Sequence, residues 1–195
     1  MLRLAVTLLA IPHFGTFDGM ADRATDTLQN QAMWALISMP SIQKAFFYTP
    51  CKWTGVECIR NRVTAIEWPV PKNPHWKLNV SWIPPTIVTI IAQFHMATGL
   101  HTRSLPSGMR LCRITSCGLY GTVNLQCLPK ALEEIDLSSN RLHGTVHLTN
   151  LPKKLRVIIL SNNDITAIVV KHDCLPKTLH SVMFIPRKGG GMLRL

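Results

Sequence analysis

Residues 128–148 read LPKALEEIDLSSNRLHGTVHL, and this stretch decides the fold because the chain repeats it. Residues 105–125 (LPSGMRLCRITSCGLYGTVNL) and 151–170 (LPKKLRVIILSNNDITAIVV) follow the same template, LPxxLxxLxLxxNxLxGxVxL, at a spacing of 23 residues. A period of this size predicts a solenoid, in which each unit buries its apolar face against its neighbours.

The two halves of the template carry different structural expectations. In LxL the apolar residues alternate with an exposed one, which predicts a short strand, and stacked units would form a parallel sheet. The Asn twelve residues after the first Leu suits a buried amide that satisfies turn backbone groups, repeated as a ladder in which Cys117 takes one place. The LP start and the LxGxV half predict an extended return arm, because proline fixes φ and lacks a backbone donor.

Units at the ends of the array match the template less well. The unit from Ile83 has Ala92 and His95 where Leu and Asn are expected, and the unit from Leu175 is partial. An earlier LxxLxL falls at Val63, Ile66 and Trp68. The sequence therefore predicts about five repeats over residues 61–186, the first of them degenerate, followed by a basic Gly-rich tail at residues 187–195.

The template resembles the leucine-rich repeat family, whose signature is LxxLxLxxN/CxL. The CxWxGVxC string at residues 51–58, followed by VTxI at 63–66, resembles the N-terminal cap of plant and protist extracellular members. The resemblance implies a concave parallel sheet, a Cys51–Cys58 disulfide and a helix before it. We expect a cap over residues 22–60, with the helix at Thr25–Met39, its apolar face at Leu28, Ala32, Leu36 and Met39, and its end at Pro40.

The first 21 residues have the form of a secretory signal, with a basic start and an apolar run from Leu4 to Ile11. This predicts a secreted or cell-surface protein. Two alternatives stay open: Met20 is the true initiator of a cytoplasmic chain, or the leader is an apolar flap on the first repeat. No apolar run of about 18 residues occurs, so no transmembrane helix is expected.

Composition and charge exclude some protein classes. The 195 residues are 47% hydrophobic, which is too apolar for a disordered chain. The net charge of +11 fits an acidic partner or surface without naming one. Part of it recurs at one place in the repeat, where it forms either a solvated edge or a contact surface, at Lys130, Lys153, Lys154 and Lys177.

The exposed positions of the predicted strands are the candidate ligand-binding residues, because the concave face of such a solenoid is the usual binding surface. They combine an arginine and two acids with apolar side chains where water is expected: Ile91, Leu111, Arg113, Glu134, Asp136, Val157, Ile159 and Met183. The expected ligand is a protein, with a glycan as the second candidate. Chance exposure, or cover by the C-terminal tail, is the alternative explanation of the apolar residues.

Other chemistry has little support in the sequence. We expect no enzyme, cofactor or metal, because no acid, base and nucleophile gather, and His143 and His147 fall on an extended arm. Clustered aromatics for base stacking are absent from the repeats, which disfavours nucleic acid. Asn79-Val80-Ser81 is a glycosylation acceptor if the chain is secreted. The alternatives to a binding module are an intracellular scaffold that uses its basic edge, and a decayed fragment of a larger repeat array.

The four cysteines other than Cys51 and Cys58 divide into two groups. Cys112 and Cys117 fall at inward positions and are expected to be buried thiols. Cys127 and Cys174 take equivalent places two units apart, about 10 Å, which is too far for a disulfide.

Overall fold

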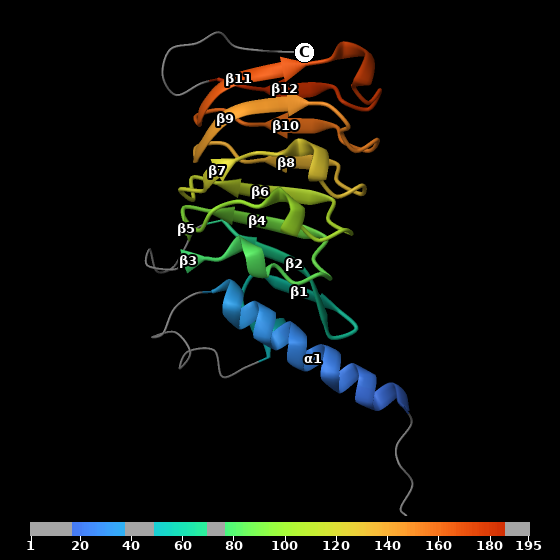
Figure 1. The fold of residues 1–195 in the computed structure, drawn as a ribbon. Helices are drawn as coiled ribbons and strands as arrows, with labels where there is room; N and C mark the ends of the chain where they lie inside the picture. Colours follow the sequence, from blue (N-terminus) through green and yellow to red (C-terminus); the bar gives the residue numbers. More distant parts are fainter. Residues whose placement is uncertain (1–16, 38–48, 70–76, 186–195) are drawn as a thin grey trace, which may run out of the picture.

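Each LxL segment forms a strand of one long sheet (Figure 1). A computed structural model describes residues 17–37, 49–69 and 77–185, without the side chains of residues 17–26 and 172. Six parallel strands follow one another along the stack: β2 (Arg62–Trp68), β4 (Thr89–Gln93), β6 (Leu111–Thr115), β8 (Glu134–Asp136), β10 (Val157–Ile159) and β12 (Ser181–Met183). Strand β1 (Val56–Ile59) extends this sheet antiparallel to β2. The predicted solenoid is confirmed.

Strand register brings equivalent template positions side by side. Hydrogen-bonded pairing aligns a central column of side chains, all at most 1% exposed: Ile66, Ile90, Cys112, Ile135, Ile158 and Val182. These are the inward positions predicted from the repeat. The unit from Ile83 is regular in space despite its degenerate sequence, because Ala92 and His95 are buried where Leu and Asn stand in other units.

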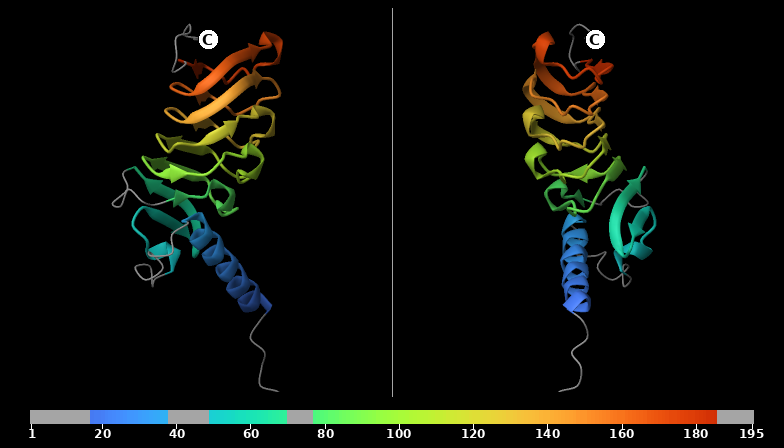
Figure 2. Two further views of the ribbon diagram at one scale, coloured as in Figure 1. Left: turned by 60° about the vertical axis from the view of Figure 1, so that its left-hand side comes forward. Right: turned by 90° about the vertical axis from the view of Figure 1, so that its right-hand side faces the viewer.

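The return arms form two smaller sheets, which the sequence predicted only as extended chain. Strands β7 (Tyr120–Thr122), β9 (Arg141–Leu148) and β11 (Asp164–Val170) pair in parallel, and β3 (Lys77–Leu78) pairs with β5 (Met96–Ala97). Single 3₁₀ turns complete the units: η2 (Val80–Trp82), η3 (Thr102–Ser104), η4 (Leu125–Cys127) and η5 (His172–Cys174). Figure 2 shows the sheets as two layers of one stack, and the apolar core fills the space between them.

The asparagine ladder forms as predicted. Asn140 accepts hydrogen bonds from the backbone N–H groups of Cys117 and Leu119, and Asn163 accepts one from that of Leu142. The residue before each ladder position has a positive φ, at Phe94, Ser116, Ser139 and Asn162. The buried side chains of the ladder therefore stabilise a left-handed turn in each of these units. This backbone conformation is sterically unfavourable for most residues other than glycine.

His95 gives the ladder a pH-sensitive position. Its Nε2 lies 3.2 Å from the carbonyl oxygen of Trp68. Burial lowers the pKa of His95 below its usual 6.5, and the hydrogen bond to Trp68 only partly opposes this. A lowered folded-state pKa means that the unfolded chain binds the proton first, so stability is lost as pH falls below about 6.5.

Replacing His95 with asparagine is expected to weaken this pH dependence. The asparagine cannot titrate and is the residue that Asn140 and Asn163 provide at equivalent places. Urea unfolding at about pH 7.5 and about pH 5.5 measures the loss of stability in each protein. We expect a smaller loss in His95→Asn, and an equal loss in both proteins would contradict the role assigned to His95.

The cap helix α1 runs from Phe17 to Leu36, so the predicted span of Thr25–Met39 is wrong at both ends. The helix ends because Ile37 pairs with Leu78 in an isolated bridge; Met39 and Pro40 lie outside the described residues. The predicted face is only partly right: Leu36 is fully buried as expected, but Leu28 is 66% exposed, and Gln29 and Met33 are the other buried residues.

A polar contact explains the different helix face. The Gln29 side chain accepts a hydrogen bond of 2.7 Å from Val63 N–H and donates one of 3.0 Å to the Asn61 carbonyl. It therefore satisfies backbone groups at the tight turn between β1 and β2 and rotates the helix onto Met33 and Leu36. Helix α1 begins inside the predicted leader, whose residues 1–16 lie outside the described part of the chain.

The Cys51–Cys58 disulfide is confirmed, with a Cα–Cα distance of 5.6 Å. It joins Cys51 in the short turn η1 (Pro50–Lys52) to Cys58 in β1, next to the edge-to-face pair of Trp34 and Trp53, whose ring centroids are 5.1 Å apart. The other four cysteines are free. Burial raises the thiol pKa of Cys112 to about 12 and that of Cys117 to about 11, so both stay protonated at neutral pH.

Candidate functional site: the outward face of the seven-stranded sheet

The candidate residues share one surface, the outward side of the seven-stranded sheet, which we call the sheet face. Strand register aligns one column of five and a neighbouring column of three: Ile91, Arg113, Asp136, Ile159 and Met183, then Leu111, Glu134 and Val157. The strands alternate buried and accessible positions, and all eight candidates fall on accessible ones. The predicted placement of these side chains is confirmed, and their role in binding stays a prediction.

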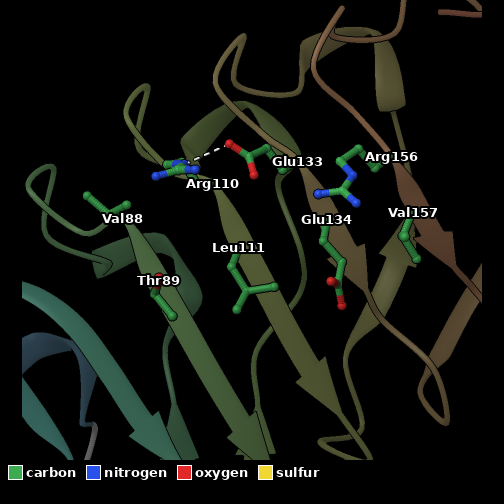
Figure 3. Close-up of a pocket in the computed structure, with 8 residues that line it drawn as sticks. All are labelled: Val88, Thr89, Arg110, Leu111, Glu133, Glu134, Arg156 and Val157. Atoms are coloured by element: carbon green, nitrogen blue, oxygen red, sulfur yellow. Dashed lines mark hydrogen bonds and ion pairs between the residues drawn. The ribbon is translucent and has the colours of Figure 1, made fainter. Parts of the chain in front are cut away.

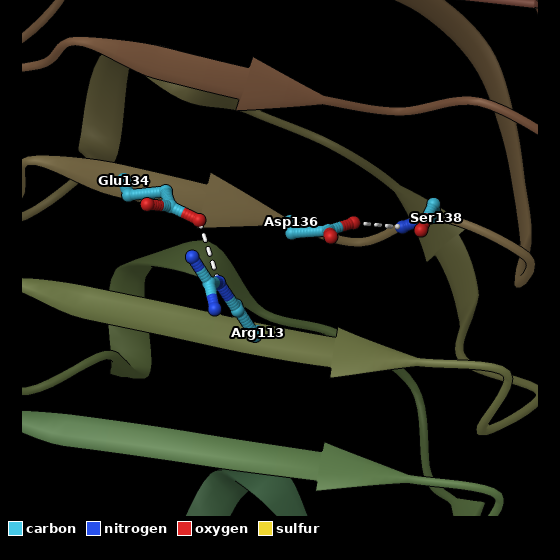
Figure 4. A network of polar contacts seen from close by, with 4 residues as sticks. All are labelled: Arg113, Glu134, Asp136 and Ser138. Carbon is cyan, nitrogen blue, oxygen red and sulfur yellow. Dashed lines mark hydrogen bonds and ion pairs between the residues drawn. The ribbon is translucent and has the colours of Figure 1, made fainter.

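Charged groups occupy the middle of the sheet face (Figure 4). Arg113 Nε donates to Glu134 Oε1 at 2.6 Å, and Asp136 Oδ1 accepts from Ser138 N–H at 2.9 Å. The hydrogen bond to Glu134 raises the pKa of Arg113 above its usual value. The pair is partly exposed, so it adds at most about 1 kcal/mol to stability. Its main effect is to hold both side chains in one orientation.

The balance of charge on this face differs from that of the whole chain. Within the two columns, Glu134 and Asp136 stand against the single cation Arg113, whereas the chain carries +11. Because Arg113 is already paired with Glu134, Asp136 contributes a fixed carboxylate to the middle of the surface. These two columns therefore carry one more negative than positive charge.

A shallow cavity of about 340 Å³ lies where strands β4 to β10 begin (Figure 3). Leu111, Glu134 and Val157 contribute to its lining, and so do residues that the sequence analysis missed: Val88, Thr89, Arg110, Glu133 and Arg156. Arg110 Nε donates to Glu133 Oε1 at 2.7 Å, which lowers the pKa of Glu133.

A repeat signal could have found these residues. Arg110, Glu133 and Arg156 are 23 residues apart, and each directly follows a fully buried apolar residue of its unit. Their backbones stack through bonds from Glu133 N–H to the Arg110 carbonyl and from Arg156 N–H to the Glu133 carbonyl. The aligned sequence thus gives a column of alternating charge at the rim of the sheet.

Apolar side chains gather toward the C-terminal end of the face. Val157 and Ile159 are partly accessible, Met183 is 37% exposed and Ile185 is 40% exposed. Strand β12 pairs only with β10 among the described residues. The face therefore offers a fixed carboxylate and an apolar surface within three adjacent strands.

Other candidate chemistry does not assemble in the described part of the chain. No three His, Cys, Asp or Glu side chains there form a metal-binding group. His143 and His147 are exposed on β9, as the repeat predicted. Lys130, Lys153, Lys154 and Lys177 are all exposed. Within residues 17–37, 49–69 and 77–185, no helix has the length and apolar character needed to cross a membrane.

The repeat template, the parallel sheet and the buried ladder together define a solenoid of the leucine-rich repeat type. No known protein family matches the sequence, and no curated protein does. Among solved structures, the chain is similar to the crystal structure of a pollen receptor kinase 3. The identity is 18%, over 72% of this chain and 82% of that one, with a TM-score of 0.47.

Proposed function

We propose that this chain is a non-enzymatic binding module that recognises a protein ligand with its sheet face. The observation that carries the proposal is the register that places Asp136 and the Arg113–Glu134 pair beside Val157, Ile159 and Met183. An apolar surface next to oriented charges is the composition of a selective protein interface, in which the charges set orientation.

The surface also favours a particular kind of ligand. A basic side chain of the ligand would meet the carboxylate of Asp136, and an apolar side chain would cover Ile159 and Met183. The cavity bounded by Arg110, Leu111 and Glu133 would take a further side chain of the same segment. The ligand is therefore an extended segment with basic and apolar residues.

The proposed location is the secretory pathway, with the mature protein outside the cell. The Cys51–Cys58 disulfide supports this, because such bonds persist in oxidising compartments. The cap of CxWxGVxC type and the leader point the same way. Cleavage of the leader is part of the proposal, as are the domain limits at residues 22, 61 and 187.

Selection from a displayed peptide library tests the proposal directly. Peptides that bind the intact chain are measured against two sheet-face variants, Met183→Asp and Asp136→Asn. We expect each variant to weaken binding about tenfold or more, which corresponds to about 1.4 kcal/mol. Asp136→Asn keeps an oxygen for the Ser138 N–H, so its effect isolates the charge.

Val169→Asp is the matched control for Met183→Asp. Both residues are exposed apolar side chains near the same end of the stack, but Val169 lies on β11 in the other sheet. Binding should survive in Val169→Asp. Equal loss in both variants, or no loss in either, would exclude the sheet face as the binding surface.

A second candidate is an intracellular scaffold that binds an acidic partner through its basic edge. The exposure of Lys130, Lys153, Lys154 and Lys177 at equivalent turns favours it. In the same assay, changing these lysines to glutamine would then abolish binding while the sheet-face variants bind normally. A glycan array run in parallel covers the glycan ligand. A folded chain that binds neither peptide nor glycan would support the decayed-array hypothesis.

A further inference from the structure

A second hollow lies away from the sheet face, lined by the start of η2, the segment between β5 and η3, strand β7 and one residue of β9. It has a volume of about 490 Å³, and we call it the Tyr120 groove. Its described lining contains no lysine, arginine, aspartate or glutamate, although the chain is strongly basic. Tyr120 is 56% exposed, and the polar side chains of Asn79, Ser81 and Thr98 line the same groove, as do His101 and His143. An exposed aromatic ring among neutral hydrogen-bonding groups suits a sugar ring.

The glycosylation acceptor itself forms part of this groove. Asn79 and Ser81 both line it, while the middle residue of the sequon, Val80, is 1% exposed and anchors the turn in the core. Residues 79–81 are the one Asn-x-Ser/Thr sequence in the chain. We propose that Asn79 carries an N-linked glycan whose first sugar packs against Tyr120 in this groove. The proposal requires entry into the secretory pathway, as proposed above, and is independent of the sheet face.

Hydrogen bonds fix the Asn79 side chain in a suitable orientation. Its Oδ1 accepts from the Ser81 N–H at 3.3 Å and from Thr98 Oγ1 at 3.4 Å. Its backbone N–H donates to the Leu36 carbonyl at 2.8 Å. The oxygen side of the amide is therefore engaged with the groove wall, and Nδ2 is the atom left to carry a sugar.

The attachment is a transfer from a lipid-diphosphate oligosaccharide, the donor of the secretory pathway. A bond forms between Asn79 Nδ2 and the anomeric carbon of the first sugar, while the bond from that carbon to the diphosphate breaks. The amide releases one proton to solvent, and the lipid diphosphate leaves with the bonding electron pair. The product has an uncharged amide at residue 79, so the charge of the groove is unchanged.

Tyr120 is placed to receive that sugar because Gly99 lies against its ring. A Cβ at residue 99 would come within 3.2 Å of Tyr120 Cε2, so the missing side chain lets the ring lie close to the backbone. The apolar C–H face of a pyranose would then cover the exposed ring, whose negative face attracts those hydrogens. Burial of this apolar area stabilises the folded chain.

The experiment expresses the full chain behind a strong heterologous secretory signal, so that its own leader is not tested at the same time. An endoglycosidase then trims the glycan to one N-acetylglucosamine, and intact mass confirms its presence. The unglycosylated reference is Ser81→Ala, which removes the sequon but keeps Asn79 and both bonds to its Oδ1. Thermal unfolding is compared between the two forms.

We expect the sugar to raise Tm by about 2–4 °C. In a Tyr120→Ala background the gain should vanish, whereas in Phe94→Ala it should remain. Phe94 is the matched control, because it is 55% exposed and lies outside the groove. In wild type, NMR should also show sugar protons shifted upfield by the Tyr120 ring, a readout that does not depend on the folding of any variant. A secreted chain without glycan, or an equal gain in Tyr120→Ala without the NMR shift, would overturn the proposal.

Discussion

Leu137→Asp is expected to unfold the repeats around β8 under conditions in which the wild-type chain is folded. Leu137 is fully buried, and its N–H donates to the Ile159 carbonyl of the next unit. Its own carbonyl accepts from the side chains of Asn140 and Asn163. A carboxylate at this position would be buried without a cation, which costs about 3–5 kcal/mol. Domains of this size are stable by about 5–15 kcal/mol in total.

Each unit of such a solenoid is stabilised mainly by packing on its two neighbours, so units farther along the stack do not compensate for this loss. Circular dichroism during urea unfolding is the measurement, with Val169→Asp as the control for adding an aspartate to an exposed apolar position. We expect Val169→Asp to unfold close to wild type and Leu137→Asp to unfold at much lower urea. A midpoint for Leu137→Asp that matched the control would mean that the side chain is not in the core.

The sequence predicted the long sheet well because one physical constraint determines it. In each unit the apolar residues of LxL must face the core, and the 23-residue period brings successive strands into register. Ile135 and Leu137 illustrate this, since both are fully buried as the alternation requires. Even His95 could be placed by counting from Ile83, although its residue type did not fit the template.

The cap helix was harder to predict because its docking depends on a polar group. The apolar spacing pointed to Leu28, but the helix contacts the first repeat through Gln29, which satisfies Asn61 and Val63 backbone groups. Hydrophobic periodicity contains no information about such a partner. The pairing of β9 with β11 was missed for a related reason, because an extended arm and a paired strand have the same local sequence pattern.

The candidate site likewise has some features that the sequence predicts and others that it does not. Arg113 and Glu134 could be placed on one face from the template, but the 2.6 Å bond between them depends on rotamers that no periodicity specifies. The cavity at the strand starts is formed by side chains such as Arg110 and Glu133, which precede the strands. The sequence analysis did not consider these two side chains, and the structure pairs them with each other.

The ladder position restricts the type of residue more strongly than the apolar core positions do. Asn140 accepts from the N–H groups of Cys117 and Leu119 and donates to the carbonyls of Ile114, Leu137 and Ser138. It is fully buried, so water cannot replace these bonds. One side chain therefore satisfies polar groups in two successive units, which explains why the template requires a short amide there.

Asn140→Ala is accordingly expected to lower the free energy of unfolding by about 3–5 kcal/mol, since each buried group left unsatisfied costs about 1–3 kcal/mol and the costs are not fully additive. Asn124→Ala is the matched control. Asn124 is the N-cap of η4, and its side chain accepts one hydrogen bond from the backbone N–H of Gln126, which is exposed. Losing such a cap costs about 0.5–2 kcal/mol. Urea unfolding of both variants gives the comparison. If Asn140→Ala cost no more than Asn124→Ala, relaxed backbone would be finding other partners, and the apolar column alone would hold the units in register.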